Sequence, residues 1–162
     1  MKIDKAIILD IDGCIATTKQ FALKKTAKTY LTKYAAYPFD KGCVNVLNKI
    51  LNETEAEIIL SSDWRLYYNI EELDEIFKIN NVIKSPIFTT SKYNGKFSAP
   101  LEYNRINQIN NVLDNNKIKR FIVIDDLDMS KAFGKAFIHC KYINEGIKQT
   151  GIKEKCINQL LK

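Results

Sequence analysis

The sequence contains little proline and glycine and has no long hydrophobic run. Its 162 residues include 3 prolines and 6 glycines, which excludes a collagen-like or low-complexity chain. No stretch approaches the roughly 18 apolar residues that span a membrane, and the apolar run near the start is short and interrupted by acidic residues. With 46% hydrophobic and 27% charged residues, the composition predicts one folded domain over residues 1–162, which we expect in the cytoplasm.

Cysteine and histidine are also sparse. The four cysteines, Cys14, Cys43, Cys140 and Cys156, form no Cys-x-x-Cys pair and do not cluster with the single histidine, His139. This spacing argues against the usual zinc motifs and favours reduced thiols. No cysteine has an arginine six residues downstream, as a cysteine-based phosphatase loop requires, so that class of enzyme is excluded.

Arginine is rare among the basic residues. The chain has 25 lysines and arginines against 19 acidic residues, and the resulting net charge of +6 would attract anionic partners only mildly. The arginines are Arg65, Arg105 and Arg120. Because arginine binds planar oxyanions through two parallel hydrogen bonds, such recognition can come from only these three positions.

Short apolar runs rich in β-branched residues alternate with segments of helical period. These patterns predict strands at residues 6–9, 57–60, 121–124 and 136–138, and helices at about 42–53, 71–79, 104–114 and 152–161. Alternating strands and helices predict an α/β fold with a parallel sheet between two layers of helices. This is a three-layer, Rossmann-like architecture.

Two segments depart from the alternation. Residues 14–38 contain a predicted helix whose apolar face includes Leu23, Tyr30 and Tyr34. Residues 85–104 contain two prolines and a glycine and are interpreted as irregular. Neither segment is long enough to form a second domain.

Polar side chains follow three of the predicted strands. They are Asp10 and Asp12 after the first, Ser61 and Ser62 after the second, and Asp125 and Asp126 after the third. Because the carboxyl ends of parallel strands meet at one edge of the sheet, we expect these side chains to converge. Several carboxylates in one place repel each other, and a divalent cation relieves that repulsion. Oxygen ligands favour Mg²⁺ over zinc.

The order of these motifs resembles that of the haloacid dehalogenase (HAD) superfamily of phosphohydrolases. The pattern is Asp-x-Asp-Gly after one strand, serine after another, a basic residue at the start of a helix, and Asp-Asp after a further strand. More narrowly, the run Ser-Ser-Asp-Trp-Arg at 61–65, the Arg105-x-x-x-Ile109 spacing and the Gly146-Ile147 pair resemble the HAD domain of Swiss Army knife RNA repair proteins. That group is related to the 3′-phosphatase of polynucleotide kinase, so the resemblance implies a phosphatase.

The resemblance also implies roles for the acidic residues. Asp10 would be the nucleophile that attacks phosphorus and forms an aspartyl-phosphate. Asp12 would protonate the leaving oxygen and later take a proton from water. Mg²⁺ would be held by the Asp10 carboxylate, the Asp12 carbonyl and Asp126, with Asp125 beside it.

The serine and basic positions leave alternatives open. Ser61 would donate a hydrogen bond to a phosphoryl oxygen, and Ser62 in the following turn is the alternative and a further substrate-binding candidate. Arg105 would supply positive charge opposite the metal. The superfamily more often has lysine at this position, so Lys92 and Lys96 remain alternatives.

Trp64 and Arg65 are additional candidates for substrate binding. Trp64 could stack on a base of a nucleic acid, or it could pack beneath a helix. Arg65 could bind a substrate phosphate, or it could pair with a nearby acid. The sequence leaves both pairs of alternatives open.

The leading hypothesis is a Mg²⁺-dependent phosphomonoesterase. Short insertions predict a minimal or absent cap, and an open site suits the end of a polymer such as a nucleic-acid 3′-phosphate. One alternative is a phosphatase of small metabolites or nucleotides, and a second is a non-catalytic binding module with a HAD fold. The chain has no P-loop motif, so a kinase or ligase step in end repair would come from a partner protein.

Overall fold

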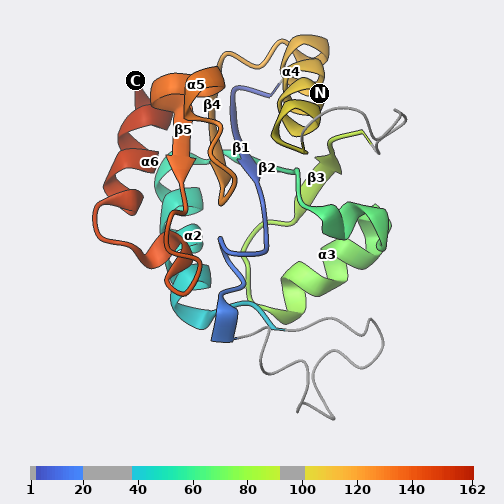
Figure 1. Cartoon of the computed structure of the whole chain (residues 1–162). Coiled ribbons are helices and arrows are strands. Elements are labelled where there is room, and N and C mark those ends of the chain that lie inside the picture. The colour runs from blue at the N-terminus through green and yellow to red at the C-terminus, as the bar shows by residue number, and fades with distance from the viewer. Residues whose placement is uncertain (1–2, 20–37, 92–100) are drawn as a thin grey trace.

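The computed structural model describes residues 3–19, 38–91 and 101–162 (Figure 1). Within these residues, five parallel strands form one sheet in the order β3-β2-β1-β4-β5. The strands are β1 (Lys5–Leu9), β2 (Glu57–Leu60), β3 (Pro86–Thr89), β4 (Arg120–Asp125) and β5 (Phe137–His139). Since all five run in the same direction, their carboxyl ends share one edge of the sheet.

The chain winds outward from β1 in two directions. It proceeds first through β2 to β3, and then returns to the other side of β1 to form β4 and β5. The strand order therefore reverses between β1 and β4. In open α/β sheets, such a switch point leaves a crevice at the carboxyl ends of the strands, where ligands bind.

Helices connect the strands. They are α2 (Lys41–Thr54), α3 (Ile70–Ile79), α4 (Leu101–Asn116), α5 (Ser130–Phe133) and α6 (Ile152–Leu161), with three short 3₁₀ helices, η1 (Asp63–Leu66), η2 (Gly134–Ala136) and η3 (Gly146–Lys148). The α2 and α6 helices lie side by side (Figure 1).

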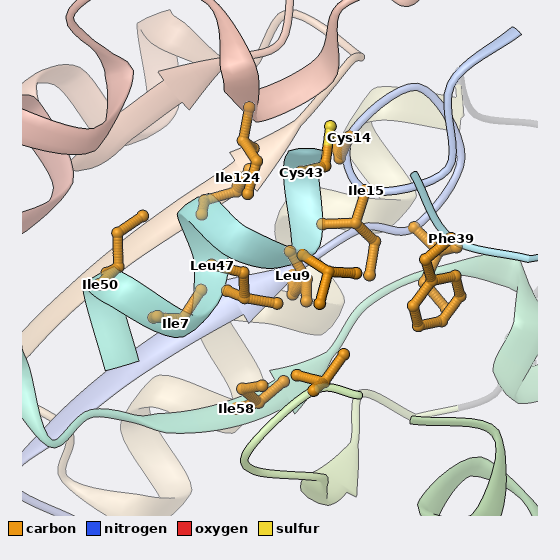
Figure 2. Packing of buried hydrophobic residues seen from close by; sticks show 14 of the residues in the cluster. Ile7, Leu9, Cys14, Ile15, Phe39, Cys43, Leu47, Ile50, Ile58 and Ile124 are labelled. Atoms are coloured by element: carbon orange, nitrogen blue, oxygen red, sulfur yellow. The ribbon is translucent and has the colours of Figure 1, made fainter. Parts of the chain in front are cut away.

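The two faces of the sheet are covered by different helices. Alternate residues of β1 point to opposite faces, as the two-residue period of a strand requires. Ile7 and Leu9 are buried with α2, α3 and α6, whereas Ala6 and Ile8 are buried with α4. Figure 2 shows the first of these clusters, with Leu47 of α2 beside the β1 residues. The result is a three-layer arrangement.

Local sequence determines where α2 and α3 begin. Asp40 precedes α2, and its side chain accepts hydrogen bonds from the backbone N–H groups of Gly42 (2.8 Å) and Cys43 (3.1 Å). Asn69 and Glu72 form a reciprocal capping box at the start of α3. Both arrangements satisfy N–H groups that a helix leaves without internal partners.

The predicted fold class is confirmed, but one strand differs from the sequence interpretation. Residues 86–89, interpreted as irregular, form β3. Pro86 opens this strand at the edge of the sheet, where a missing N–H group is tolerated, so proline was a misleading signal. In addition, α4 begins at Leu101, three residues earlier than the predicted start.

Part of the predicted insertions lies outside the described residues. Residues 20–37 and 92–100 contain most of the helix predicted within 14–38, together with Lys92 and Lys96. The expectation of a minimal cap therefore stays a prediction. Across the described residues, no helix is long and apolar enough to cross a membrane.

Candidate active site

Asp10 lies at the sheet's switch point, immediately after β1. Its backbone N–H donates to the carbonyl oxygen of Ile124 in β4 (2.9 Å), which anchors it between the two central strands. The chain then turns at Gly13, whose φ is +77°. A Cβ atom there would lie 2.9 Å from Asp126 Oδ2. Glycine is therefore required both for the turn and for the close approach of Asp126.

Three carboxyl groups from β1 and β4 meet at this point. Asp10, Asp125 and Asp126 each offer an oxygen atom within 4.8 Å of the others. Asp10 is 3% exposed and Asp125 is fully buried, whereas Asp126 is partly exposed. The cluster is thus an acidic site with one side open to solvent.

Burial and mutual repulsion change the acidity of the cluster. Burial raises the pKa of Asp10 well above its usual value, and the neighbouring Asp125 raises it further, while Arg105 opposes both effects. Burial also raises the pKa of Asp125 to about 6, although Arg105 and the N–H group of Leu127 oppose the shift. The positive charge within the described residues does not fully offset the negative charge of these carboxyl groups.

The donor set fits a hard divalent cation. All three side chains offer carboxylate oxygens, the ligands that Mg²⁺ prefers, and their spacing lets one ion contact all of them. A bound cation would also counter the repulsion that raises the pKa values. The Asp12 side chain is not part of this group, and the expected contact through its backbone carbonyl stays a prediction.

Arg105 projects from α4 into the acidic cluster. Its Nη1 atom donates to both oxygens of Asp125 (3.2 and 3.0 Å) and lies 3.7 Å from Asp10 Oδ1. Burial opposes the ionisation of Arg105, but the carboxylates of Asp10, Asp125 and Asp63 outweigh this effect and raise its pKa. The guanidinium therefore stays charged beside the proposed nucleophile.

Three hydroxyl groups are buried near the same edge of the sheet. Ser61 and Ser62 follow β2, and Thr90 follows β3. Within the described part of the chain, none of these hydroxyl oxygens has a hydrogen-bond partner of good geometry. Ser62 nevertheless lies near enough to Asp10 to favour its ionised form. Buried hydroxyls in this state are available to a bound oxyanion.

The side chain of Asp12 points toward η1. The indole Nε1 of Trp64 donates to both of its carboxylate oxygens, at 3.2 and 3.1 Å. Asp12 is partly exposed, unlike Asp10. The two acids of the first motif therefore have different surroundings, one in the acidic cluster and one against an indole N–H.

A comparison with protein families matches this chain over most of its length. Residues 6–151 match the family described as the HAD domain in Swiss Army Knife RNA repair proteins. The chain belongs to this family. Neither the comparison with curated proteins nor that with solved structures found a match.

Membership of this family indicates the kind of reaction that the site supports. The HAD domain points to a phosphatase-type hydrolase, and HAD enzymes generally use Mg²⁺. The acidic cluster of this HAD domain lies at the ends of β1 and β4. It provides the oxygen ligands that such an ion requires.

Arg65 lies beneath the site rather than at its surface. Its side chain is 4% exposed, and Nη1 donates to the carbonyl oxygens of Ser61 and Ser62, both at 2.7 Å. Nη2 donates to Gln108 Oε1 of α4 (2.8 Å). Arg65 therefore joins the serine turn to the helix that carries Arg105.

Three residues near the site were missed in the sequence analysis. Asp63 accepts a hydrogen bond from Arg105 Nη2 (3.2 Å) and pairs with Arg65 at 3.3 Å. Gln108 and Thr90 are buried beside the serine turn and at the end of β3. Asp63 lies inside the Ser-Ser-Asp-Trp-Arg run, so this motif could have identified it as a residue of the site. No sequence pattern marked Gln108 or Thr90.

Proposed function

We propose that this HAD domain is a Mg²⁺-dependent phosphomonoesterase that acts through an aspartyl-phosphate on Asp10. The observation that carries the proposal is the convergence of the Asp10, Asp125 and Asp126 oxygens within 4.8 Å, with the Arg105 guanidinium 3.7 Å from Asp10. A buried nucleophile, an acidic ion site and a fixed positive charge are the components that phosphoryl transfer requires.

In the first half of the reaction, an Asp10 oxygen attacks the phosphorus of the substrate. A bond forms between that oxygen and phosphorus, and the bond from phosphorus to the leaving oxygen breaks. Asp12 donates its proton to the leaving oxygen, so the product departs as an alcohol. Arg105 and the hydroxyl of Ser61 stabilise negative charge on the phosphoryl oxygens, with Ser62 as the alternative donor.

In the second half, water hydrolyses the aspartyl-phosphate. Asp12, now ionised, takes a proton from the water as the water oxygen attacks phosphorus. The bond between phosphorus and Asp10 breaks, and inorganic phosphate is released. Both catalytic carboxyl groups return to their starting states.

Asp10, Asp125 and Asp126 would hold the Mg²⁺ ion, with the Asp12 carbonyl as a further ligand. When bound, the ion neutralises phosphate charge and helps to align the attack. The protein's own contribution is to keep three carboxyl groups together at the switch point. The N–H of Leu127 supports this by donating to Asp125 Oδ1 (2.9 Å).

We further propose that the substrate is a nucleic-acid 3′-phosphate end. The family occurs in RNA repair proteins, and the net charge of +6 suits a polyanion. Exposed tyrosines also occur directly after η1, after β5 and near the start of α4: Tyr67 (78% exposed), Tyr142 (53%) and Tyr103 (59%). Aromatic rings in such positions can stack on unpaired bases.

The proposal predicts selective release of phosphate from one isomer. Purified protein is incubated with an oligonucleotide 3′-phosphate, its 5′-phosphate isomer or p-nitrophenyl phosphate, each with Mg²⁺ or with EDTA. We expect Mg²⁺-dependent release from the 3′-phosphate, loss of release in Asp10→Asn, and wild-type release in the matched surface variant Asp114→Asn. Asp114 is exposed near the end of α4.

Other outcomes would separate the parts of the proposal. Release from p-nitrophenyl phosphate alone would retain the mechanism and favour a small-metabolite or nucleotide substrate. No release from any substrate would favour a non-catalytic binding module. Full activity in Asp10→Asn would contradict the aspartyl-phosphate.

A phosphatase of this kind would supply 3′-hydroxyl ends to a joining reaction. We propose that a kinase or ligase partner performs the nucleotide-dependent steps of end repair, since the family occurs in RNA repair proteins. The assay above tests the phosphatase without such a partner.

A further inference from the structure

Trp64 is held firmly beneath the surface of the site. It belongs to η1, directly after the Ser61-Ser62 turn, and is 6% exposed. The rings of Phe39 and Tyr68 pack against it at tilts of 56° and 52°, each with its centroid 5.7 Å from that of the indole. This enclosure does not leave an indole face open to stack on a substrate base, so a different role must explain its place beside the site.

The indole N–H is directed at Asp12. Nε1 lies 3.2 Å from one carboxylate oxygen and 3.1 Å from the other. An indole nitrogen can donate a hydrogen bond but cannot accept one. Because packing fixes the ring, this hydrogen bond helps to restrict the rotation of the partly exposed Asp12 carboxyl group.

We propose that Trp64 is a positioning residue that holds Asp12 for proton transfer to the leaving oxygen. This inference rests on the proposed phosphatase function. When Asp12 is protonated, the oxygen without the proton is the better acceptor for the indole N–H. The other oxygen would then carry the proton that passes to the leaving oxygen. Proton transfer breaks this O–H bond, forms one on the leaving oxygen, and leaves Asp12 ionised against the same indole.

The chemical consequence depends on the leaving group. A ribose alkoxide is a poor leaving group, so its departure requires the proton from Asp12. A p-nitrophenolate leaves readily without one. The ratio kcat/KM reports only the steps through departure of the first product. Misplacing Asp12 should therefore lower kcat/KM more for the 3′-phosphate than for p-nitrophenyl phosphate.

The kinetic test removes the donor and keeps the ring. Trp64 is the only tryptophan, and its replacement by benzothienylalanine exchanges N–H for sulfur with little change in shape. Trp64→Phe is the second variant, in case the first folds poorly. We expect the fall in kcat/KM for the 3′-phosphate to exceed the fall for p-nitrophenyl phosphate by about tenfold, a fraction of a full general-acid contribution.

A packing control separates positioning from general damage. Leu160→Ala removes a buried side chain of α6 from the core and leaves Trp64 with both of its aromatic neighbours and its N–H group. We expect this variant to lower kcat/KM for both substrates by the same factor. Equal losses for both substrates in the two Trp64 variants would overturn the positioning role.

A second measurement does not depend on catalysis. The single indole gives one N–H resonance in a ¹⁵N-labelled sample, and a carboxylate acceptor moves it downfield and slows its exchange with solvent. We expect Asp12→Ala to reverse both effects and Asp114→Asn to reverse neither. An unchanged indole resonance in Asp12→Ala would overturn the inference even if the protein is an active phosphatase. If Asp12→Ala changes the indole resonance as expected but the wild-type protein releases no phosphate, the contact between Trp64 and Asp12 stands and only the proposed phosphatase function is contradicted.

Discussion

Asp125 illustrates how strongly one carboxyl group depends on its surroundings. It is fully buried, accepts hydrogen bonds from Arg105 and the Leu127 N–H, and lies beside Asp10 and Asp126. Burial dominates, and the pKa of Asp125 rises to about 6. The ionised site is therefore costly to maintain in the metal-free protein.

This shift predicts an unusual pH dependence of stability without metal. The folded state binds the Asp125 proton more tightly than the unfolded chain does. The free energy of unfolding should then fall by about 2 kcal/mol as the pH rises from about 4 to about 6. Urea unfolding in EDTA at several pH values measures this slope. Saturating Mg²⁺ should reverse it, and Asp125→Asn should reduce it, because the buried Asp10 still contributes. A metal-free slope of the opposite sign would contradict the argument.

Arg105 gives a second prediction for a single residue. Its guanidinium is the only arginine or lysine side chain, among the described residues, that pairs with Asp10 within 4 Å. Arg105→Ala should reduce kcat by about 10²–10³, because it removes positive charge from the phosphoryl oxygens. Lys92→Ala should retain most of the activity. Steady-state kinetics at saturating Mg²⁺ measures both variants, and the reverse ranking would assign the basic position to Lys92.

The start of α2 shows how one residue can stabilise an element and join it to another. The Asp40 side chain caps α2 through the N–H groups of Gly42 and Cys43 and also pairs with Lys148 of η3 at 2.8 Å. Burial opposes ionisation of Asp40, but the hydrogen bond from Lys148 and those from the backbone lower its pKa. The cap therefore depends on a charged side chain.

Replacing Asp40 should separate the cap from the ion pair. Asp40→Ala removes both and should lower the free energy of unfolding by about 2 kcal/mol. Asp40→Asn retains a capping oxygen and should cost about half as much. Urea unfolding at neutral pH measures the difference. Equal losses in the two variants would show that the ion pair, and not the cap, stabilises the start of α2.

At the scale of the whole molecule, the loop after β1 packs directly on the chain near η3. The carbonyl oxygen of Cys14 accepts a hydrogen bond from the N–H of Ile147 (2.9 Å). Gly146 has a φ of +57°, and a Cβ atom there would lie 2.1 Å from that same carbonyl oxygen. The loop after β1, which carries Asp10 and Asp12, is thus supported by η3, which lies near the end of the sequence.

A methyl group at this contact should disrupt the fold. Gly146→Ala should lower the free energy of unfolding by about 3 kcal/mol or more, since both the positive φ and the backbone clash oppose it. Gly151→Ala is the matched control, because Gly151 also has a positive φ but no other atom lies within 4 Å of its added Cβ. It should cost about 1 kcal/mol. Equal unfolding midpoints in urea for the two variants would contradict the proposed contact.

Much of the fold followed from local patterns. Four of the five strands and the positions of four helices were visible as apolar runs and helical periods, because these depend on neighbouring residues. The strand β3 was missed because a proline such as Pro86 usually argues against a strand. It is tolerated at the edge of a sheet, but the sequence does not show which strand lies at the edge. The convergence of Asp10 and Asp125 followed from the parallel topology itself.

The fold class and the acidic residues of the candidate site could be predicted from the order of strands and motifs along the chain. The different contacts of neighbouring residues within one motif became evident only in the folded structure. Arg65 binds backbone carbonyl groups beneath the serine turn, Trp64 donates to Asp12, and Asp63 pairs with Arg105. Hydrogen bonds depend on distance and direction between elements far apart in the chain, and spacing along the sequence does not record either.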